Sequence, residues 1–501
     1  MKKYILEVTV FIAGAMILIL ELAAARIMAP YFGTSNIIWT SIIGIILFSS
    51  SVGYYLGGIS ADSKPVYKKD KTKGKGGGLI EDKSRKYNML SVIITLAGVW
   101  ILALPMCNTA VLKSIAAHIS DIRVGAVLAS VILFLPPTIL LGIVSPFAVK
   151  LKLEDLSSTG KIAGKLSAIA TLGSIAGTFL AGFLLIPLMG SSKILFLIGI
   201  TLVSLSILVY LSNYKTIILK CLVCVLLLFT GHSVKDTIVD VDSEYGRIMV
   251  YTTKFEKRDI QVMEINKGFQ SAMFLDNPYE LVYEYTKYYN LMNYFNDRIT
   301  NTLLIGGAAY SFPKHYIKEY PERFIDVVEI DPKVTEIAKK HFYLEENDRL
   351  SIVHQDGRIY LNKNRKKYDA ILNDAFVGET QPFHLSTLET VGKIYESLNE
   401  NGVYLINIAA SLEGKNARLL NEKVNTLKAV FPHVYVFALR KEHKEMIQNI
   451  MLVASKAENR KEIILTQNGD MDKMLINYCR VNTGNAGILT DDYAPIDYYI
   501  F

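Results

Sequence analysis

The run TLLIGGAAYSFPKHYIKEYPERFIDVVEIDP, residues 302–332, decides the fold of the second half of the chain. It contains two short apolar runs typical of buried strands, 302–305 and 325–330, and the first leads directly into a glycine pair at 306–307. The second ends in Glu-Ile-Asp-Pro at 329–332, which puts a carboxylate about 20 positions after the glycines. Glycines after one strand and a carboxylate after the next are typical of an α/β sheet that binds a nucleoside.

The same alternation of strands and helices continues along the chain. Further runs of the buried-strand kind lie at 350–353, 370–373, 403–408, 433–438 and 449–453. Segments with helical periodicity lie between strands at 333–341, 386–398 and 417–430. Strands that alternate with helices predict a doubly wound, mostly parallel sheet, so we expect a Rossmann-like α/β domain over residues 281–501. A helix near 280–293 would precede its first strand.

A small antiparallel β region is expected before this domain, over residues 240–280. Its strands would be 246–252, 260–265 and 269–274, with a turn at Lys267-Gly268.

The first part of the chain has the composition of a membrane domain. The chain is 51% hydrophobic with a mean hydropathy of +0.28, and the excess lies before residue 232. An apolar stretch of about 20 residues crosses a bilayer as a helix. We therefore predict an α-helical multi-span membrane domain over residues 1–232, with six to seven spans. The runs are 5–25, one within 27–61, 87–112, 124–149, 166–192, 194–214 and a short seventh, 217–230. Gly173, Gly177 and Gly182 predict close helix packing.

The basic residues indicate topology rather than nucleic-acid binding. The net charge of +7 comes largely from membrane loops, above all the loop 62–87, which the positive-inside rule places in the cytoplasm. Lys220 and the shortness of 217–230 favour a segment that does not cross, which would leave the C-terminal domain cytoplasmic. We expect a multi-pass cell-membrane protein whose partner is the lipid bilayer. The four cysteines give neither a disulfide framework nor metal-ligand spacing with His, so no metal is expected.

The glycines after the first strand and carboxylates at the ends of the next three strands predict the ligand site. In a doubly wound sheet, ligands bind beyond the carboxyl ends of the strands. Glu329 has the spacing that suits ribose hydroxyls, and Asp356, with Gly357, could meet the exocyclic amine of an adenine. Asp374 ends the fourth strand and would point at the same crevice. Each carboxylate alone could equally be a helix cap or a solvated loop residue.

These motifs resemble those of spermidine synthases, over roughly residues 240–455. The similar segments are 266–270, 303–307, 327–332, 355–358 and 368–374. The apolar half resembles bacterial proteins that fuse such a domain to transmembrane helices, and this likeness lies in 21–33, 171–187 and 489–495. The resemblance implies a fold of the class I methyltransferase and spermidine synthase type.

The resemblance also implies roles for individual residues. Glu329 would hold ribose, Asp356 and Gly357 would hold adenine, and the Pro382 loop would close over the nucleoside. Asp374 would be the base that deprotonates the attacking amine. The remaining cofactor-binding residues would be Gly306, Gly307 and Asp331. Those expected to face the amine substrate are Gln270, Tyr283 and Glu284. The co-substrate would be decarboxylated S-adenosylmethionine or S-adenosylmethionine, and a homodimer is left open.

Several positions depart from the family pattern. Ala309 and Val377 stand where the family has Asp, Tyr283 where it has His, and Gly246 where it has Gln. The lost acidic groups are those that would hold a positively charged amine. Glu379, Glu284 or Asp276 could substitute for them.

Three functions remain open on this evidence. The first is aminopropyl transfer from decarboxylated S-adenosylmethionine to a polyamine such as putrescine. The second is an S-adenosylmethionine-dependent methyltransferase acting on a membrane-delivered acceptor. The third is a transporter with a nucleoside-sensing domain.

Overall fold

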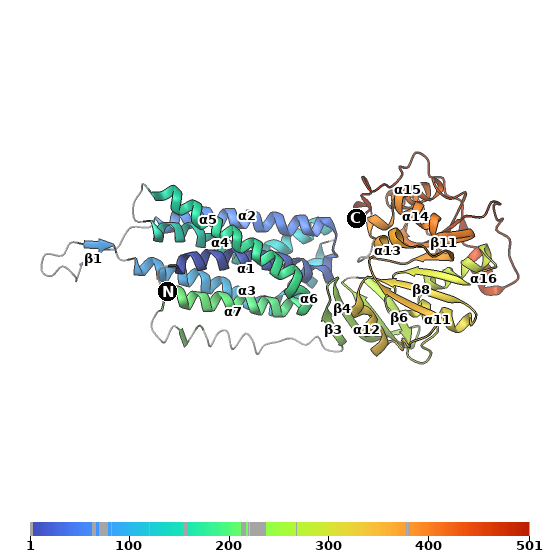
Figure 1. The fold of residues 1–501 in the computed structure, drawn as a ribbon, viewed down its shortest axis with the longest axis horizontal. Helices are drawn as coiled ribbons and strands as arrows, with labels where there is room; N and C mark the ends of the chain where they lie inside the picture. The colour runs from blue at the N-terminus through green and yellow to red at the C-terminus, as the bar shows by residue number, and fades with distance from the viewer. Residues whose placement is uncertain are drawn as a thin grey trace. The chain divides into compact units, whose positions relative to one another are not determined.

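The computed structural model divides into two compact units, Met1–Lys235 with Asp242–Arg247 and Asp236–Val241 with Ile248–Phe501 (Figure 1). The described residues are 4–62, 67–69, 79–81, 83–119, 121–153, 158–211, 217–218, 220, 237–266, 268–376, 378 and 381–499.

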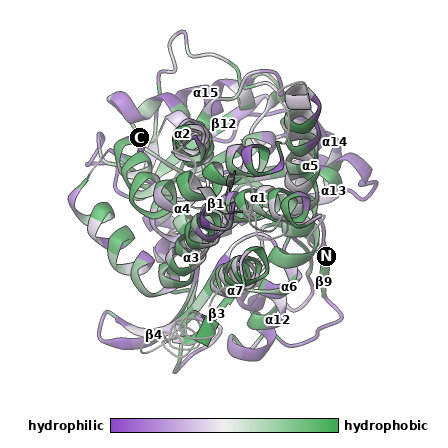
Figure 2. Ribbon diagram, turned by 90° about the vertical axis from the view of Figure 1, so that its left-hand side faces the viewer, coloured by the Kyte–Doolittle hydropathy of each residue, from purple (hydrophilic) through white to green (hydrophobic). Residues whose placement is uncertain are grey.

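Long apolar helices make up the first unit. Among the described residues, six helical segments are long and apolar enough to cross a membrane, judged by length and composition, and Figure 2 shows their hydrophobic residues. They are α1 (Ile5–Phe32), α2 (Asn36–Ala61), α3 (Ser84–His118), α4 (Ile122–Lys152), the segment Thr159–Leu188 and α7 (Ser191–Val209). The fifth consists of α5 (Thr159–Leu180), one π-helical turn and the short α6 (Ile186–Leu188).

These helices coincide with the six longer runs of the sequence, although α1 continues beyond the expected end at residue 25 to Phe32. The seventh run, 217–230, lies outside the described residues except for 217–218 and 220. Most of the basic loop 62–87 also lies outside them. Its described parts include a short antiparallel pair, β1 (Tyr67–Lys69) and β2 (Leu79–Glu81).

Glycines set the close approach of α1 and α5. A Cβ atom at Gly173 would collide with the carbonyl group of Phe11, and one at Gly177 would collide with the backbone of Ala15. The predicted packing role of these two glycines is confirmed. The prediction was wrong for Gly182, because a Cβ there meets nothing within 4 Å.

A small sheet opens the second unit. Its strand order is β3-β4-β5-β6, and β4, β5 and β6 pair in antiparallel fashion. The strands are β3 (Thr237–Asp242), β4 (Arg247–Phe255), β5 (Arg258–Ile265) and β6 (Gly268–Phe274). Strand β3 was not predicted from the sequence.

The large sheet has eight strands in the order β14-β12-β13-β11-β10-β7-β8-β9. Neighbours from β11 to β9 pair in parallel, whereas β13 runs antiparallel between β11 and β12. The strands are β7 (Asn301–Ile305), β8 (Phe324–Glu329), β9 (Leu350–His354), β10 (Tyr368–Asn373), β11 (Leu398–Ala410), β12 (His433–Ala438), β13 (Gln448–Ser455) and β14 (Tyr478–Cys479). The mixed α/β sheet and the helical region before it confirm the predicted fold class.

Apolar residues on both faces of this sheet pack against helices. Leu304 and Leu405 join one core cluster, while Leu303 and Ile406 join another, as the alternation of side chains along a strand requires. The helices are α9 (Glu284–Lys287), α10 (Leu291–Phe295), α11 (Ser311–Glu319), α12 (Pro332–His341), α13 (Gly357–Lys363), α14 (Leu388–Ser397), α15 (Arg418–Lys428) and α16 (Gly469–Leu475). The single helix expected near 280–293 is instead α9, a 3₁₀ turn and α10.

The glycine contact between α1 and α5 gives a first prediction. Gly173→Ala should destabilise the helical unit by about 1–3 kcal/mol, because the two backbones must separate to admit a methyl group. Gly164→Ala, on the same helix where a Cβ meets nothing within 4 Å, should be neutral or slightly stabilising. Thermal unfolding of both variants in detergent makes the comparison. Equal midpoints would contradict the packing role of Gly173.

Candidate functional site

The candidate site lies at the carboxyl ends of four neighbouring parallel strands, β10, β7, β8 and β9. Gly306 follows β7 with a φ of +95°, and a Cβ atom there would lie 2.7 Å from the carbonyl oxygen of Asp374. Only glycine allows this conformation and this approach together. The loop after β7 therefore lies directly against the residue that ends β10.

Glu329 holds this loop in place. Its Oε2 atom accepts the backbone N–H groups of Gly307, at 2.8 Å, and Ala308, at 3.1 Å, while Oε1 accepts that of Asp331 at 3.0 Å. Ala308 has a φ of +44° and Tyr310 a φ of +56°, conformations that are strained for residues with a side chain. Burial raises the pKa of Glu329 above its ordinary value, and the three N–H groups oppose that rise.

Two further carboxylates begin helices. Asp331 Oδ1 accepts the N–H of Lys333 at 2.9 Å and caps α12, while its buried Oδ2 has no hydrogen-bond partner among the described residues. Asp356 Oδ1 accepts the N–H of Ile359 at 3.0 Å and caps α13. Its Oδ2 lies 3.2 Å from His384 Nε2. The helix caps weighed from the sequence are thus present, and each carboxylate keeps a second oxygen for other partners.

Gly357 and Pro382 shape the segments on either side of Asp356. A Cβ atom at Gly357 would lie 2.7 Å from Cγ2 of Ile305, so a larger residue would push α13 away from β7. The carbonyl oxygen of Pro382 accepts the N–H of Leu385 at 3.0 Å, which forms the 3₁₀ turn that carries His384.

Asp374 is held by two donors at the end of β10. Tyr285 Oη donates to Oδ2 at 3.2 Å, and Asn407 Nδ2 donates to Oδ1 at 3.3 Å. Asn407 reaches this place because Asn373 pairs with Ile406 across β10 and β11. Burial raises the pKa of Asp374 to about 6, although the neighbouring side chains of Tyr289, Asn407 and Tyr285 act to lower it.

Three residues were expected to face the amine, and the structure ties two of them to this region. Gln270 Nε2 donates to the carbonyl oxygen of Gly378 at 3.4 Å. Tyr283 stacks on Tyr285, with ring centroids 6.2 Å apart, and burial raises the pKa of Tyr283 to about 12. Glu284 is exposed on α9, and within the described parts of the chain no hydrogen bond or ion pair joins it to Asp374.

The structure also describes Asp276, which could replace the lost acidic groups, and Ala309, one of the positions where an acidic group is lost. Asp276 accepts two hydrogen bonds from Arg258, at 2.7 and 3.0 Å, so its charge is already neutralised. Ala309 is fully buried in an apolar cluster with Val334 and Phe342. A carboxylate at 309 would be desolvated there, so its absence is accounted for by packing. Val377 and Glu379 lie outside the described residues.

Three residues of the site were missed from the sequence: Tyr285, His384 and Asn407. One feature of the sequence could have indicated Asn407 as a site residue, because it is an amide within the otherwise apolar run of β11. Tyr285 and His384 lie close to Tyr283 and Pro382 in sequence, but nothing in their spacing pointed to Asp374 or Asp356.

Comparison with known proteins agrees with the motifs. Residues 291–463 match the model of the family described as "Spermine/spermidine synthase domain", which confirms the resemblance of the C-terminal region. The polyamine aminopropyltransferase of Vibrio vulnificus is 32% identical over 163 residues, which cover 32% of this chain and 53% of that protein. The probable polyamine aminopropyl transferase of Bifidobacterium longum is 30% identical over 223 residues, covering 40% and 49%. The chain thus spans about half the length of these relatives.

A methyltransferase and a solved structure are also similar. The N-terminal histidine N-methyltransferase of Emericella nidulans is 32% identical over 146 residues, covering 28% of this chain and 25% of that protein. The structure of a probable spermidine synthase from Corynebacterium glutamicum covers 52% of this chain and 97% of its own, with 18% identity and a TM-score of 0.42.

The Glu329 contacts give a second prediction. In Glu329→Gln the amide NH₂ would face a backbone N–H donor, so at least one buried hydrogen bond is lost. We expect the second unit to lose about 1–3 kcal/mol of stability, measured by thermal unfolding of the full-length protein. The matched control is Glu336→Gln, an exposed glutamate on α12. Equal unfolding of the two variants would show that the carboxylate does not hold the loop.

Proposed function

We propose that this chain is a membrane-bound transferase of the spermidine synthase type, which moves an aminopropyl group from decarboxylated S-adenosylmethionine to a polyamine such as putrescine. The observation that carries the proposal is Asp374. It is a desolvated carboxylate with a pKa of about 6, held by Tyr285 and Asn407 against the loop that follows β7. A strongly shifted carboxylate at a ligand-binding strand end is a candidate catalytic group.

The reaction needs a base and a held donor. An ammonium has no lone pair, so the acceptor must lose a proton, which Asp374 takes in its carboxylate form. The amine nitrogen then forms a bond to the carbon beside the sulfonium, and the carbon–sulfur bond breaks. Its electron pair stays on sulfur and methylthioadenosine leaves.

The nucleoside half of the donor would lie along the carboxylates of β8 and β9. Within the described part of the chain, Glu329 Oε1 accepts one backbone N–H, and a carboxylate oxygen can accept two hydrogen bonds. One position therefore remains for a ribose hydroxyl. Asp331 Oδ2 and Asp356 Oδ2 would supply further acceptors toward the same nucleoside, and Gly306 and Gly307 would contribute only backbone atoms, because Asp374 and Tyr310 fill the space beside them.

The aromatic side chains beside Asp374 suit a cationic acceptor. Ammonium groups bind the faces of Tyr rings, and Tyr283 and Tyr285 stack next to the base. We infer that these rings contribute to binding the ammonium group of the acceptor.

A methyltransferase remains the second candidate, and one observation favours it. Asp276, one of the acidic residues considered for binding an amine, is neutralised by Arg258, which weakens the case for a polyamine. In that case S-adenosylmethionine would be the donor and the acceptor would be membrane-delivered. A nucleoside-sensing domain of a transporter would bind nucleoside and turn over neither donor.

Asp374→Asn gives the third prediction. The amide keeps the shape of the carboxylate but accepts no proton, so product formation should fall by a factor on the order of 10²–10⁴. Affinity for methylthioadenosine should stay close to wild type. The assay gives purified full-length protein each adenosyl donor with putrescine and follows methylthioadenosine or S-adenosylhomocysteine.

The control is Asp348→Asn, an exposed carboxylate. Turnover of putrescine that survives Asp374→Asn would remove Asp374 as the base. Failure of the wild type to use putrescine while it binds nucleoside would reject aminopropyl transfer to this acceptor.

The pKa of Asp374 gives the fourth prediction. With a pKa of about 6 in the ligand-free protein, the carboxylate form that acts as base is depleted below that pH, so kcat/KM should rise with pH through about 6. Because the pKa is raised by folding, the stability contributed by this group is present below its unfolded pKa of about 3.9 and lost as pH rises through 6. The stability of Asp374→Asn relative to wild type should therefore be higher at pH 8 than at pH 4, because the amide carries no buried charge at high pH. A kcat/KM without an inflection near pH 6 would contradict the assignment.

A further inference from the structure

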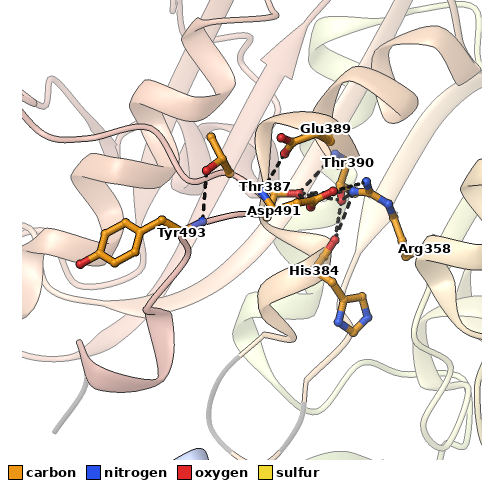
Figure 3. Close-up of polar contacts among 8 residues, drawn as sticks. Arg358, His384, Thr387, Glu389, Thr390, Asp491 and Tyr493 are labelled. Carbon is orange, nitrogen blue, oxygen red and sulfur yellow. Dashed lines mark hydrogen bonds and ion pairs between the residues drawn. The ribbon is translucent and has the colours of Figure 1, made fainter.

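A C-terminal segment outside the family match lies against α13 and α14, the helices that follow β9 and β10. The match ends at residue 463, yet the carbonyl oxygen of Leu489 accepts the N–H of Leu388, at the start of α14, at 2.8 Å. Figure 3 shows the next residues reaching the beginning of α14 and the side chain of Arg358 on α13.

Asp491 is bonded to three separate places. Its Oδ2 lies 2.8 Å from Nη2 of Arg358, and its Oδ1 accepts the hydroxyl of Thr387 at 2.6 Å. Its backbone N–H donates to Glu389 Oε2 at 3.0 Å. One carboxylate thereby fixes the first turn of α13 to the N-terminus of α14.

Arg358 connects Asp491 to the segment that carries His384. Its Nη1 donates to the carbonyl oxygen of His384 at 3.4 Å and to Oγ1 of Thr387 at 3.3 Å, and it also contacts Thr390 Oγ1. The imidazole of His384 meets Asp356, 3.2 Å away. Asp356 in turn caps the helix that carries Arg358. The contacts therefore run from Asp491 through Arg358 and His384 to Asp356, the carboxylate at the end of β9.

The segment is anchored on a packed helix. Leu489 is 1% exposed and packs with Leu419, Ile496 and Tyr499. Its N–H donates to Thr426 Oγ1 of α15 at 2.9 Å. Asp491 is therefore fixed relative to α15, and a fixed carboxylate can hold Arg358 in one geometry.

We propose that Asp491 is a positioning residue for the adenine-bearing donor, acting through Arg358 and His384 on Asp356. The proposal rests on the nucleoside binding assumed in the proposed function. It adds the segment 489–491 to the parts of the chain that set donor affinity, and it assigns His384 to orienting the carboxylate that faces the adenine.

The test measures binding of methylthioadenosine to full-length protein in detergent by calorimetry. Asp491→Asn removes the carboxylate charge that pairs with Arg358, and only one of the two side-chain atoms, the amide oxygen, can still accept a hydrogen bond. We expect affinity to fall about tenfold or more, on the scale of one lost charge-assisted hydrogen bond. Asp491→Glu should restore part of it. The KM for the acceptor should stay unchanged, because Asp491 acts on the donor loops only.

Two controls separate positioning from general stability. Glu413→Gln breaks an exposed ion pair with Lys444 in the same unit and should leave affinity unchanged. In a His384→Ala background, Asp491→Asn should add little further loss, because the imidazole that contacts Asp356 is already gone.

Each outcome bears on one of the two proposals. Wild-type affinity in Asp491→Asn, or an equal loss with and without His384, would overturn the positioning role. Nucleoside binding that depends on Asp491 without turnover of putrescine would support the positioning role while rejecting aminopropyl transfer. Failure of the wild type to bind methylthioadenosine would overturn both.

Discussion

The site depends on one buried carboxylate that accepts three backbone N–H groups. Glu329 bonds Gly307, Ala308 and Asp331, and these bonds offset the strain of a loop with Gly306, Ala308 and Tyr310 at positive φ. Because that loop is fixed, the backbone of Gly306 can lie against Asp374. The loop after β7 and the end of β10 therefore share one structural support.

The two acidic groups of the site differ in how well their charge is satisfied. Glu329 has three backbone donors, whereas Asp374 has two side-chain donors at 3.2 and 3.3 Å. Burial raises the pKa of both, but a carboxylate with fewer and longer hydrogen bonds is the better proton acceptor. Glu329 is suited to hold the backbone, and Asp374 is suited to exchange a proton.

Much of this arrangement could be read from the sequence, because it depends on local pattern. The apolar runs marked the six long helices, and the strand ends at 306–307, 329, 356 and 374 were brought to one edge by the parallel order of β10, β7, β8 and β9. What failed depends on tertiary contacts. Asn407 reaches Asp374 only through the register of β10 and β11, and no pattern in one strand reveals its pairing. His384 and Asp491 meet Asp356 and Arg358 across long stretches of chain.

The position of β13 has a consequence for biosynthesis. The nascent chain makes β11 and β12 before β13, yet β13 lies between them and pairs with both. Until its residues leave the ribosome, β11 carries an open edge of unpaired N–H and C=O groups, and such edges invite pairing with other chains. Synthesis runs at roughly 5–20 residues per second, and the stretch from Ala410 to Gln448 takes on the order of seconds to make. A stall within that stretch would leave the newly made sheet open and exposed to aggregation.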